Sequence, residues 1–170
     1  GNCITFDKDV HIDVETLQWS PDSKKIAFSE DFLITFRDSD IWLYDTETNT
    51  VKDLTPNANR EKKLISNSDP KVIFTVDLIP QWSSDSQSIY FIRYVFSTTK
   101  EARPHFTKIN ITDGTIEDVG LVESSIAFSS YSFELSPDNA QVAYNTDTRG
   151  KGKDGTWFLD LATQQTQFAA

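Results

Sequence analysis

The sequence predicts an all-β chain built from three repeated units, each of four short antiparallel strands. Three observations support this fold class. A turn-and-strand motif occurs three times, a hairpin motif follows each copy in the same order, and apolar residues alternate with a period near two. No stretch has the apolar spacing of a helix of normal length. A chain of 170 residues with 38% hydrophobic and 12% aromatic residues can also bury a sizeable core.

The first element of each unit is a tight turn between two strands. A large apolar residue ends one strand, a Ser-Pro-Asp or Ser-Ser-Asp turn follows, and an alternating strand begins. Proline presets φ at the first central position of the turn, and Asp or Ser side chains can bond nearby backbone amides. The three copies of this element occupy residues 19–28, 82–91 and 135–144.

The second element of each unit is a hairpin, found at residues 40–54, 105–119 and 155–168. Its two strands flank a short polar loop, and the loop tips Asn49, Gly114 and Gln164 align between the copies. A hairpin tip favours a residue that tolerates positive φ, so asparagine and glycine suit this position and glutamine suits it poorly. Each unit is therefore predicted to form a sheet that cannot bury both of its faces alone.

The two elements together resemble a known repeat. The pattern W-S-P-D-G-x-x-I-A-F followed by D-I-W-x-x-D-x-x-T-G is similar to the WD40-like (PD40) repeat of TolB-type β-propellers, which the propeller domains of prolyl-oligopeptidase-type peptidases share. The resemblance covers residues 10–168. It implies one β-propeller-like domain over residues 1–170, an incomplete propeller of about three four-stranded antiparallel blades. The implied blades occupy approximately residues 10–55, 71–119 and 125–168.

The chain departs from this pattern at two positions of the motif. The glycine that usually follows the aspartate is replaced by Ser23, Ser86 and Asn139, and Leu135 replaces the tryptophan in the third copy. These departures bear on the rigidity of the turns and leave the predicted fold unchanged. The repeat also places the tryptophans Trp19 and Trp82 at equivalent positions, where we expect both to be buried between neighbouring sheets.

Charge and cysteine content exclude several classes of protein. With 16 basic and 26 acidic residues the net charge is −10, which argues against a surface for nucleic acid or an anionic membrane, since both need clustered basic residues. A single cysteine, Cys3, cannot form an internal disulfide. Cys3 near the N-terminus fits either an ordinary thiol or a chain derived from a lipoprotein, although Asn2 stands where Gly, Ala or Ser is usual. The absence of methionine indicates a chain that is processed or cut from a longer one.

Two motifs suggest ligand sites, and in both cases a structural explanation is favoured. Residues 150–155 match the dinucleotide-binding string G-x-G-x-x-G, but an extended run follows where nucleotide binding requires a helix. In residues 7–15 the alternation predicts a strand with Asp9, His11, Asp13 and Glu15 on one face, which could hold a divalent cation or form a solvated surface. We therefore predict no catalytic, cofactor-binding or metal-binding residues and no cofactor.

The sequence supports two hypotheses for function. The first is a non-catalytic, extracytoplasmic bacterial β-propeller module for protein binding or assembly, since the resemblance implies a periplasmic or cell-surface setting and a protein partner. The second is an accessory propeller of a larger hydrolase of the prolyl-oligopeptidase or dipeptidyl-peptidase type, whose catalytic domain is not in this chain. Neither hypothesis includes an activity of the chain itself. The predicted binding loops are residues 30–38, 57–70 and 148–154.

The number of repeats predicts association. Closed propellers have about 4 to 8 blades, and the sequence contains three. Exposed sheet faces and strand edges would favour contact with further blades. We expect either a homodimer or higher assembly through blade faces, or a fragment of a larger propeller, with no nucleic acid partner and no membrane span.

Overall fold

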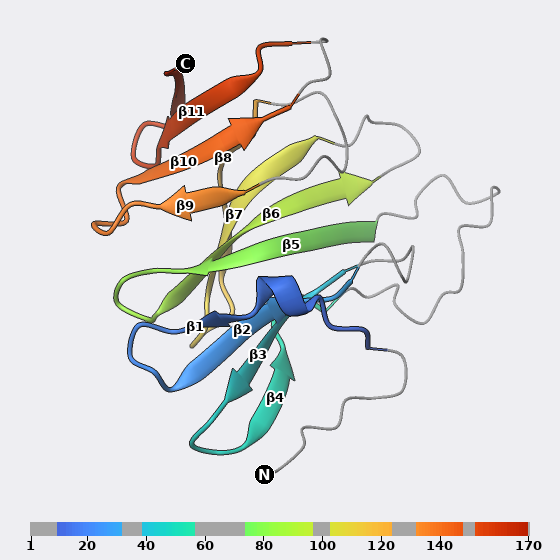
Figure 1. Ribbon diagram of the computed structural model, residues 1–170. Helices are drawn as coiled ribbons and strands as arrows, with labels where there is room; N and C mark the ends of the chain where they lie inside the picture. Colours follow the sequence, from blue (N-terminus) through green and yellow to red (C-terminus); the bar gives the residue numbers. More distant parts are fainter. Residues whose placement is uncertain are drawn as a thin grey trace, which may run out of the picture.

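The structure is a computed structural model that describes residues 10–31, 39–56, 74–96, 103–123, 132–147 and 152–169. Its strands form three four-stranded antiparallel sheets, which confirms the predicted fold class. The sheets stack face to face, with the first (blue to teal) and the third (orange to red) on either side of the second (Figure 1). We call the side of a sheet that faces the preceding sheet its leading face, and the opposite side its trailing face.

Strand order follows chain order in every sheet. A 3-10 helix, η1 (Val14–Thr16), precedes the first sheet. That sheet comprises β1 (Gln18–Trp19), β2 (Lys25–Ser29), β3 (Ile41–Asp45) and β4 (Thr50–Asp53). The second comprises β5 (Phe74–Trp82), β6 (Ser88–Phe96), β7 (Pro104–Asn110) and β8 (Ile116–Leu121). The third comprises β9 (Phe133–Leu135), β10 (Gln141–Thr146), β11 (Gly155–Asp160) and β12 (Gln165–Phe168).

The repeated motifs occupy the same register in all three sheets. Each motif's first large apolar residue pairs with the residue seven positions later, which pairs in turn with one residue of the third strand. The fourth strand completes each row. The three equivalent rows are Trp19–Ile26–Tyr44–Val51, Trp82–Ile89–Ile109–Ile116 and Leu135–Val142–Leu159–Thr166.

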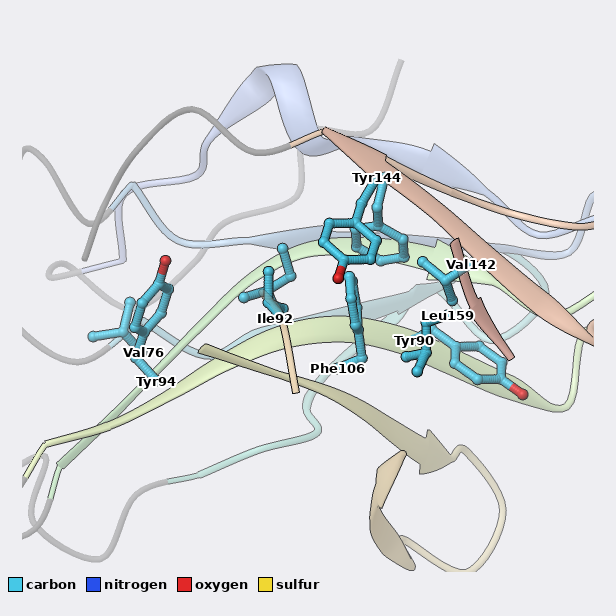
Figure 2. Packing of buried hydrophobic residues seen from close by; sticks show 10 residues of the cluster. Val76, Tyr90, Ile92, Tyr94, Phe106, Val142, Tyr144 and Leu159 are labelled. Carbon is cyan, nitrogen blue, oxygen red and sulfur yellow. The ribbon is translucent and has the colours of Figure 1, made fainter. Parts of the chain in front are cut away.

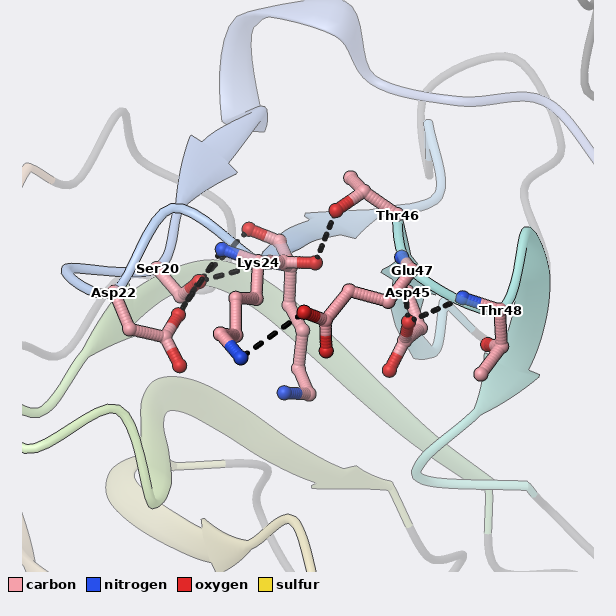
Figure 3. Close-up of polar contacts among 8 residues, drawn as sticks. Ser20, Asp22, Lys24, Asp45, Thr46, Glu47 and Thr48 are labelled. Carbon is pink, nitrogen blue, oxygen red and sulfur yellow. Dashed lines mark hydrogen bonds and ion pairs between the residues drawn. The ribbon is translucent and has the colours of Figure 1, made fainter.

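The turn between the first two strands has the same hydrogen bonds in each sheet. A serine hydroxyl donates to an aspartate Oδ1 at 2.6 Å, and the aspartate accepts a backbone N–H from two residues further on (Figure 3). These bonds, the serine bond first, hold the pKa of each aspartate below its ordinary value. The serine–aspartate pairs are Ser20–Asp22, Ser83–Asp85 and Ser136–Asp138.

The residues that replace the usual glycine adopt positive φ, at 61° for Ser23, 60° for Ser86 and 58° for Asn139. Two of these side chains bond to the turn of the preceding sheet. The Ser86 hydroxyl accepts the backbone N–H of Asp22 at 3.1 Å, and the Asn139 amide oxygen accepts that of Ser84 at 2.9 Å. A glycine would adopt this positive φ without strain but has no side chain to make these bonds. The serine and asparagine that replace it in the second and third sheets therefore join neighbouring turns.

A β-bulge in β5 decides which face of the second sheet carries Trp82. The register shifts between Leu78 and Gln81, where Ile79 has a φ of 58° and Pro80 cannot donate to the ladder. Without the bulge, Val76 and Trp82 would point to the same face, because side chains alternate along a strand. Instead Val76 lies in the cluster toward the third sheet and Trp82 in the cluster toward the first.

Two buried clusters hold the three sheets together. The smaller one lies between the first and second sheets and includes Ala27, Leu43 and Trp82. The larger one lies between the second and third sheets, where Phe106 contacts the rings of Phe133 and Tyr144 edge-on at 5.2 and 5.0 Å between centroids (Figure 2). Every described sheet thus buries at least one face against a neighbour, as the repeat requires.

Two expectations about particular residues are wrong. Trp19 is 59% exposed, whereas Trp82 is buried, because no described sheet covers the leading face of the first sheet at Trp19. The strand expected over residues 7–15 does not continue to its end, since Val14–Thr16 form η1. Asp13 is the N-cap of η1 and accepts the backbone N–H of Glu15 at 3.1 Å, which turns the chain out of the extended conformation. Asp9 lies outside the described residues.

No helix in the described part of the chain is long and apolar enough to cross a membrane.

Candidate functional site at the loop end of the sheets

The two ends of the stack are built differently. At one end, which we call the turn end, the serine–aspartate turns and the hairpin tips connect consecutive strands by short turns (Figure 1). At the other end, the loop end, the strands border the segments 32–38, 97–102 and 148–151. β4 also ends, and β5 begins, at this end of the stack.

The loop end contains the described parts of two of the three predicted binding loops. Glu30 and Asp31 follow β2, and residues 152–154 precede β11, so these described parts lie at that end. The rest of the predicted loops, residues 32–38, 57–70 and 148–151, lies outside the described residues. The G-x-G-x-x-G string runs into β11, an extended strand, and no helix follows it as nucleotide binding would require.

Side chains at the loop end differ between the sheets, although the turns at the other end are alike. The position directly after Ser29 in β2 is Glu30, and its equivalents in the second and third sheets are Arg93 and Thr146. An acid, a base and a hydroxyl therefore occupy the same place on three similar scaffolds. Such variation at one end of a rigid scaffold is typical of positions that serve recognition.

An ion pair between Asp77 and Arg93 lies at the centre of this end. The guanidinium binds the carboxylate with two hydrogen bonds, Nε to Oδ1 at 2.7 Å and Nη2 to Oδ2 at 2.6 Å. Asp77 is fully buried and the Arg93 side chain is 18% exposed. Burial raises the pKa of Asp77, while hydrogen bonds from Arg93 and Thr55 and the charge of Arg93 oppose this shift.

This ion pair is part of the joint between the first and second sheets. The backbone N–H of Asp77 donates to the carbonyl of Ser39 at 2.7 Å, in a parallel bridge between the two sheets. The Ser39 hydroxyl lies 3.0 Å from the carbonyl oxygens of both Glu30 and Asp77 and can donate to either. The Arg93 guanidinium also lies 5.2 Å from the centre of the Phe91 ring.

The polar row continues outward across the second sheet. His105 pairs with Arg93 in the ladder, and its Nδ1 lies 2.8 Å from Asp118 Oδ2. The distance is that of an ion pair when the imidazole is protonated, and His105 Nδ1 has no hydrogen-bond partner among the described residues. From the inner strand outward the row is thus Asp77, Arg93 and His105, and Asp118 of the outer strand lies beside His105 although the ladder pairs it with Thr107.

The first and third sheets use an indole at the corresponding place. Trp42 Nε1 donates to Glu30 Oε1 at 2.8 Å, and Trp157 Nε1 donates to Thr146 Oγ1 at 3.1 Å. In the second sheet Thr107 takes the place of the tryptophan, which leaves room for the guanidinium of Arg93. Each sheet therefore has its own polar group, fixed by its own neighbour, at the loop end.

This arrangement provides fixed hydrogen-bonding groups and charges. Within the described ranges, no cluster of three or more His, Cys, Asp or Glu side chains could hold a metal ion. Sequence reasoning did not identify Asp77 and Arg93 as a pair. A signal existed, because Asp77 lies in an apolar stretch that precedes Trp82 and Arg93 interrupts the apolar run of β6. Two opposite charges in apolar strands of one hairpin indicate a buried ion pair.

Comparison with known proteins bears on the fold. No protein-family profile matches the chain, and no curated protein sequence matches it. Among solved structures, the chain is similar to TolB from Acinetobacter baumannii, at 17% identity and a TM-score of 0.56 over 97% of this chain. It is similar to oligogalacturonate lyase from Vibrio parahaemolyticus, at 11% identity and a TM-score of 0.53 over 96% of this chain. The dipeptidyl peptidase 4 of Porphyromonas gingivalis matches 89% of it, at 12% identity and a TM-score of 0.50.

The chain spans only part of each of these proteins, at 33% of TolB, 41% of the lyase and 24% of the peptidase. At such low identity the likeness concerns architecture. It agrees with the register of the three sheets and with the repeated serine–aspartate turns, which were the basis of the resemblance in the sequence. The chain therefore has the fold of a TolB-type β-propeller, of which it forms three blades.

Proposed function

We propose that the chain is a non-catalytic binding module that holds a protein partner at its loop end. The observation that carries the proposal is the contrast between the two ends of the blades. The turn end repeats the same bonds three times, whereas the loop end places Glu30, Arg93 and Thr146 at one equivalent position. A scaffold with uniform turns at one end and different side chains at the other is suited to present a specific surface at the variable end.

The proposed setting is extracytoplasmic, in the periplasm or at the cell surface of a bacterium. The support is the likeness in fold to TolB and the resemblance of the repeat to that family. The thiol of Cys3 would then be a candidate for lipid attachment. Fractionation of cells that produce the natural protein tests this setting, and recovery in the cytoplasm alone would contradict it.

The binding proposal is tested with two matched double variants. One reverses two exposed charges at the loop end, Arg103→Glu with Asp147→Lys. The other reverses an exposed ion pair at the turn end, Lys24→Glu with Glu47→Lys, whose wild-type groups lie 3.0 Å apart (Figure 3). Both variants keep the net charge. The immobilised chains are exposed to a bacterial periplasmic extract, and the captured proteins are quantified by mass spectrometry.

We expect a captured protein that the loop-end variant loses by about tenfold or more, the scale of one substantial interface contact. The turn-end variant should retain it. Equal capture by wild type and both variants would contradict binding at the loop end. A peptidase assay of the purified chain should be blank, and turnover that survives rigorous purification would contradict a non-catalytic module.

A second candidate function is that of an accessory propeller in a larger hydrolase. It is favoured by the likeness in fold to dipeptidyl peptidase 4, of which the chain spans 24%. Sequencing the full reading frame separates the two candidates. A downstream G-x-S-x-G segment within a strand–turn–helix context would favour the hydrolase, and a stop codon soon after the propeller would favour the binding module.

A further inference from the structure

The first and third sheets each have one face that no described sheet covers. On the leading face of the first sheet, Trp19 is 59% exposed and Ile26 and Tyr44 are partly exposed. On the trailing face of the third sheet, Phe158 is 38% exposed and Ala143 is partly exposed. Exposed apolar side chains on opposite end faces of a stack are a means of association.

The interface between the first and second sheets shows how such faces fit together. The leading row of the second sheet begins with Trp82 and Ile89, and the trailing row of the first contains Ala27 and Leu43. These four residues belong to one buried cluster. Trp82 Nε1 also donates to the backbone carbonyl of Gln18 at 3.0 Å. A large indole therefore faces a sheet that carries a small alanine.

The interface between the second and third sheets has the opposite distribution of sizes. The leading row of the third sheet begins with Leu135, which is smaller than tryptophan, and the trailing row of the second contains Tyr90, which is larger than alanine. Both lie in the cluster between these sheets. Each interface thus combines a larger residue on one face with a smaller one on the other, Trp82 with Ala27 in the first cluster and Tyr90 with Leu135 in the second.

The two open faces match the tryptophan–alanine combination. The uncovered leading row of the first sheet begins with Trp19 and Ile26. It corresponds to the leading row of the second sheet, which begins with Trp82 and Ile89. The open trailing row is Glu134–Ala143–Phe158–Gln167, and its centre corresponds to the Ala27–Leu43 pair of the first sheet. In the described part of the chain, a face with tryptophan is therefore uncovered at one end of the stack, and a face with alanine and a large apolar residue is uncovered at the other.

We propose that the leading face of the first sheet binds the trailing face of the third sheet of a second copy of this chain. Trp19 then packs on Ala143 and Phe158 of the second copy, and its indole N–H donates to the carbonyl of Glu134, the equivalent of Gln18. Ser23, whose φ matches those of Ser86 and Asn139, offers its hydroxyl to the turn of the second copy at Asp138. The same contact made twice closes a six-bladed ring, within the range of about 4 to 8 blades.

The contact is confined to the half of the leading face near the turn end. Phe28, further along β2, is already buried in the single chain. Each chain carries a net charge of −10, so the two copies repel each other at low ionic strength and the apolar contact must exceed that repulsion. The association is therefore expected to strengthen as salt is added.

Sedimentation velocity and light scattering of the 170-residue chain at physiological salt test the proposal. The expected mass is twice the 19.3 kDa of one chain. Trp19→Glu and Phe158→Glu should each raise the dissociation constant by about 30-fold or more, the scale of an interface hot spot. Val95→Glu is the matched control, because Val95 is 42% exposed but belongs to the second sheet and lies on neither end face. This variant should remain a dimer.

Mixing the two interface variants tests the head-to-tail arrangement. Trp19→Glu retains an intact third sheet and Phe158→Glu an intact first sheet, so the mixture should form a dimer through one unaltered contact. A face-to-face contact between two first sheets would show no such recovery. Circular dichroism establishes that each variant is folded before its mass is measured. A wild-type chain that stays monomeric at high concentration, a dimer that survives Trp19→Glu, or a mixture that stays monomeric would each overturn the proposal.

Discussion

The indole N–H of Trp82 donates a hydrogen bond to the backbone carbonyl of Gln18, which lies 3.0 Å away and 64 residues earlier in the chain. The bond joins the second blade to the first at the point where Trp82 is buried. The equivalent Trp19 is exposed, so the two tryptophans share one motif but differ in environment.

Trp82→Phe should lower the free energy of unfolding by about 1–3 kcal/mol, because the carbonyl of Gln18 loses its donor and the smaller ring leaves a void. Trp19→Phe is the matched control and should change stability by about 0.5 kcal/mol or less in dilute solution, where the side chain is exposed. Urea unfolding of both variants measures the difference. Equal effects would show that the bond to Gln18 contributes nothing measurable.

Glycine substitution in two equivalent turns should change stability by different amounts. Ser23→Gly relieves positive φ and removes no side-chain bond found among the described residues, so we expect stability to rise by up to about 1 kcal/mol. Ser86→Gly gives the same relief but removes the acceptor of the Asp22 N–H, a loss of about 1 kcal/mol. Thermal unfolding should therefore place Ser23→Gly above wild type and Ser86→Gly at or below it. If both variants gain equally, the contact between the turns is not stabilising.

The Asp77–Arg93 pair should make stability depend on pH in a predictable direction. Because burial raises the folded-state pKa of Asp77 above the ordinary 3.8, stability from its neutral form is present at low pH and is lost as pH rises through the folded pKa. Arg93→Met removes the positive charge that opposes this shift. The variant should lose about 3–5 kcal/mol at neutral pH and less in acid, where Asp77 is protonated.

Urea unfolding of Arg93→Met at several pH values between neutral and acid measures this trend. The double variant Asp77→Asn with Arg93→Met serves as the control, because it leaves no buried charge and should recover much of the loss at neutral pH. A deficit of the single variant that is independent of pH would show that packing, and not the uncompensated carboxylate, accounts for it.

Ionisation of Tyr144 should lower the stability of the folded chain at alkaline pH. Burial raises the pKa of its hydroxyl to about 12. The hydroxyl also accepts the backbone N–H of Glu123 at 3.2 Å. As the folded pKa exceeds the ordinary 10.0, the unfolded chain ionises first, and stability falls as pH rises from 10.0 towards 12. Tyr144→Phe should cost about 1 kcal/mol at neutral pH and make this alkaline fall less steep. An unchanged alkaline slope in denaturant titrations would contradict the assignment.

The sequence was sufficient to predict the blades because their information is local. The turn around Asp22 and its two equivalents needs only residues within six positions of one another, and alternation determines the strands around it. The positive φ of Ser23, Ser86 and Asn139 also agrees with the glycine usually found there. Local patterns of this kind are visible without knowledge of neighbouring sheets.

One error concerns burial, which depends on a neighbouring sheet, and another concerns a local cap that ends a strand. Trp19 has the same motif as Trp82, but burial requires a sheet beside it, and no local pattern records that sheet. Asp13 ended the expected strand because its carboxylate caps η1, a choice that alternation cannot reveal. The sequence carries a signal for the Asp77–Arg93 pair, two opposite charges in apolar strands of one hairpin, but only the register of β5 on β6 places the two residues opposite each other.

Strand order that follows chain order has a consequence for how the molecule folds. Contacts within a blade join segments close in sequence, so each blade closes loops at low entropic cost and can nucleate by itself. The blades then couple to their nearest neighbours, as units of a one-dimensional array do. In a single chain, the middle blade packs on described neighbours from both sides, whereas each outer blade packs on one. In dilute solution, where the chain is monomeric, amide hydrogens of β6 and β7 should therefore exchange with solvent most slowly, and the outer blades should open first.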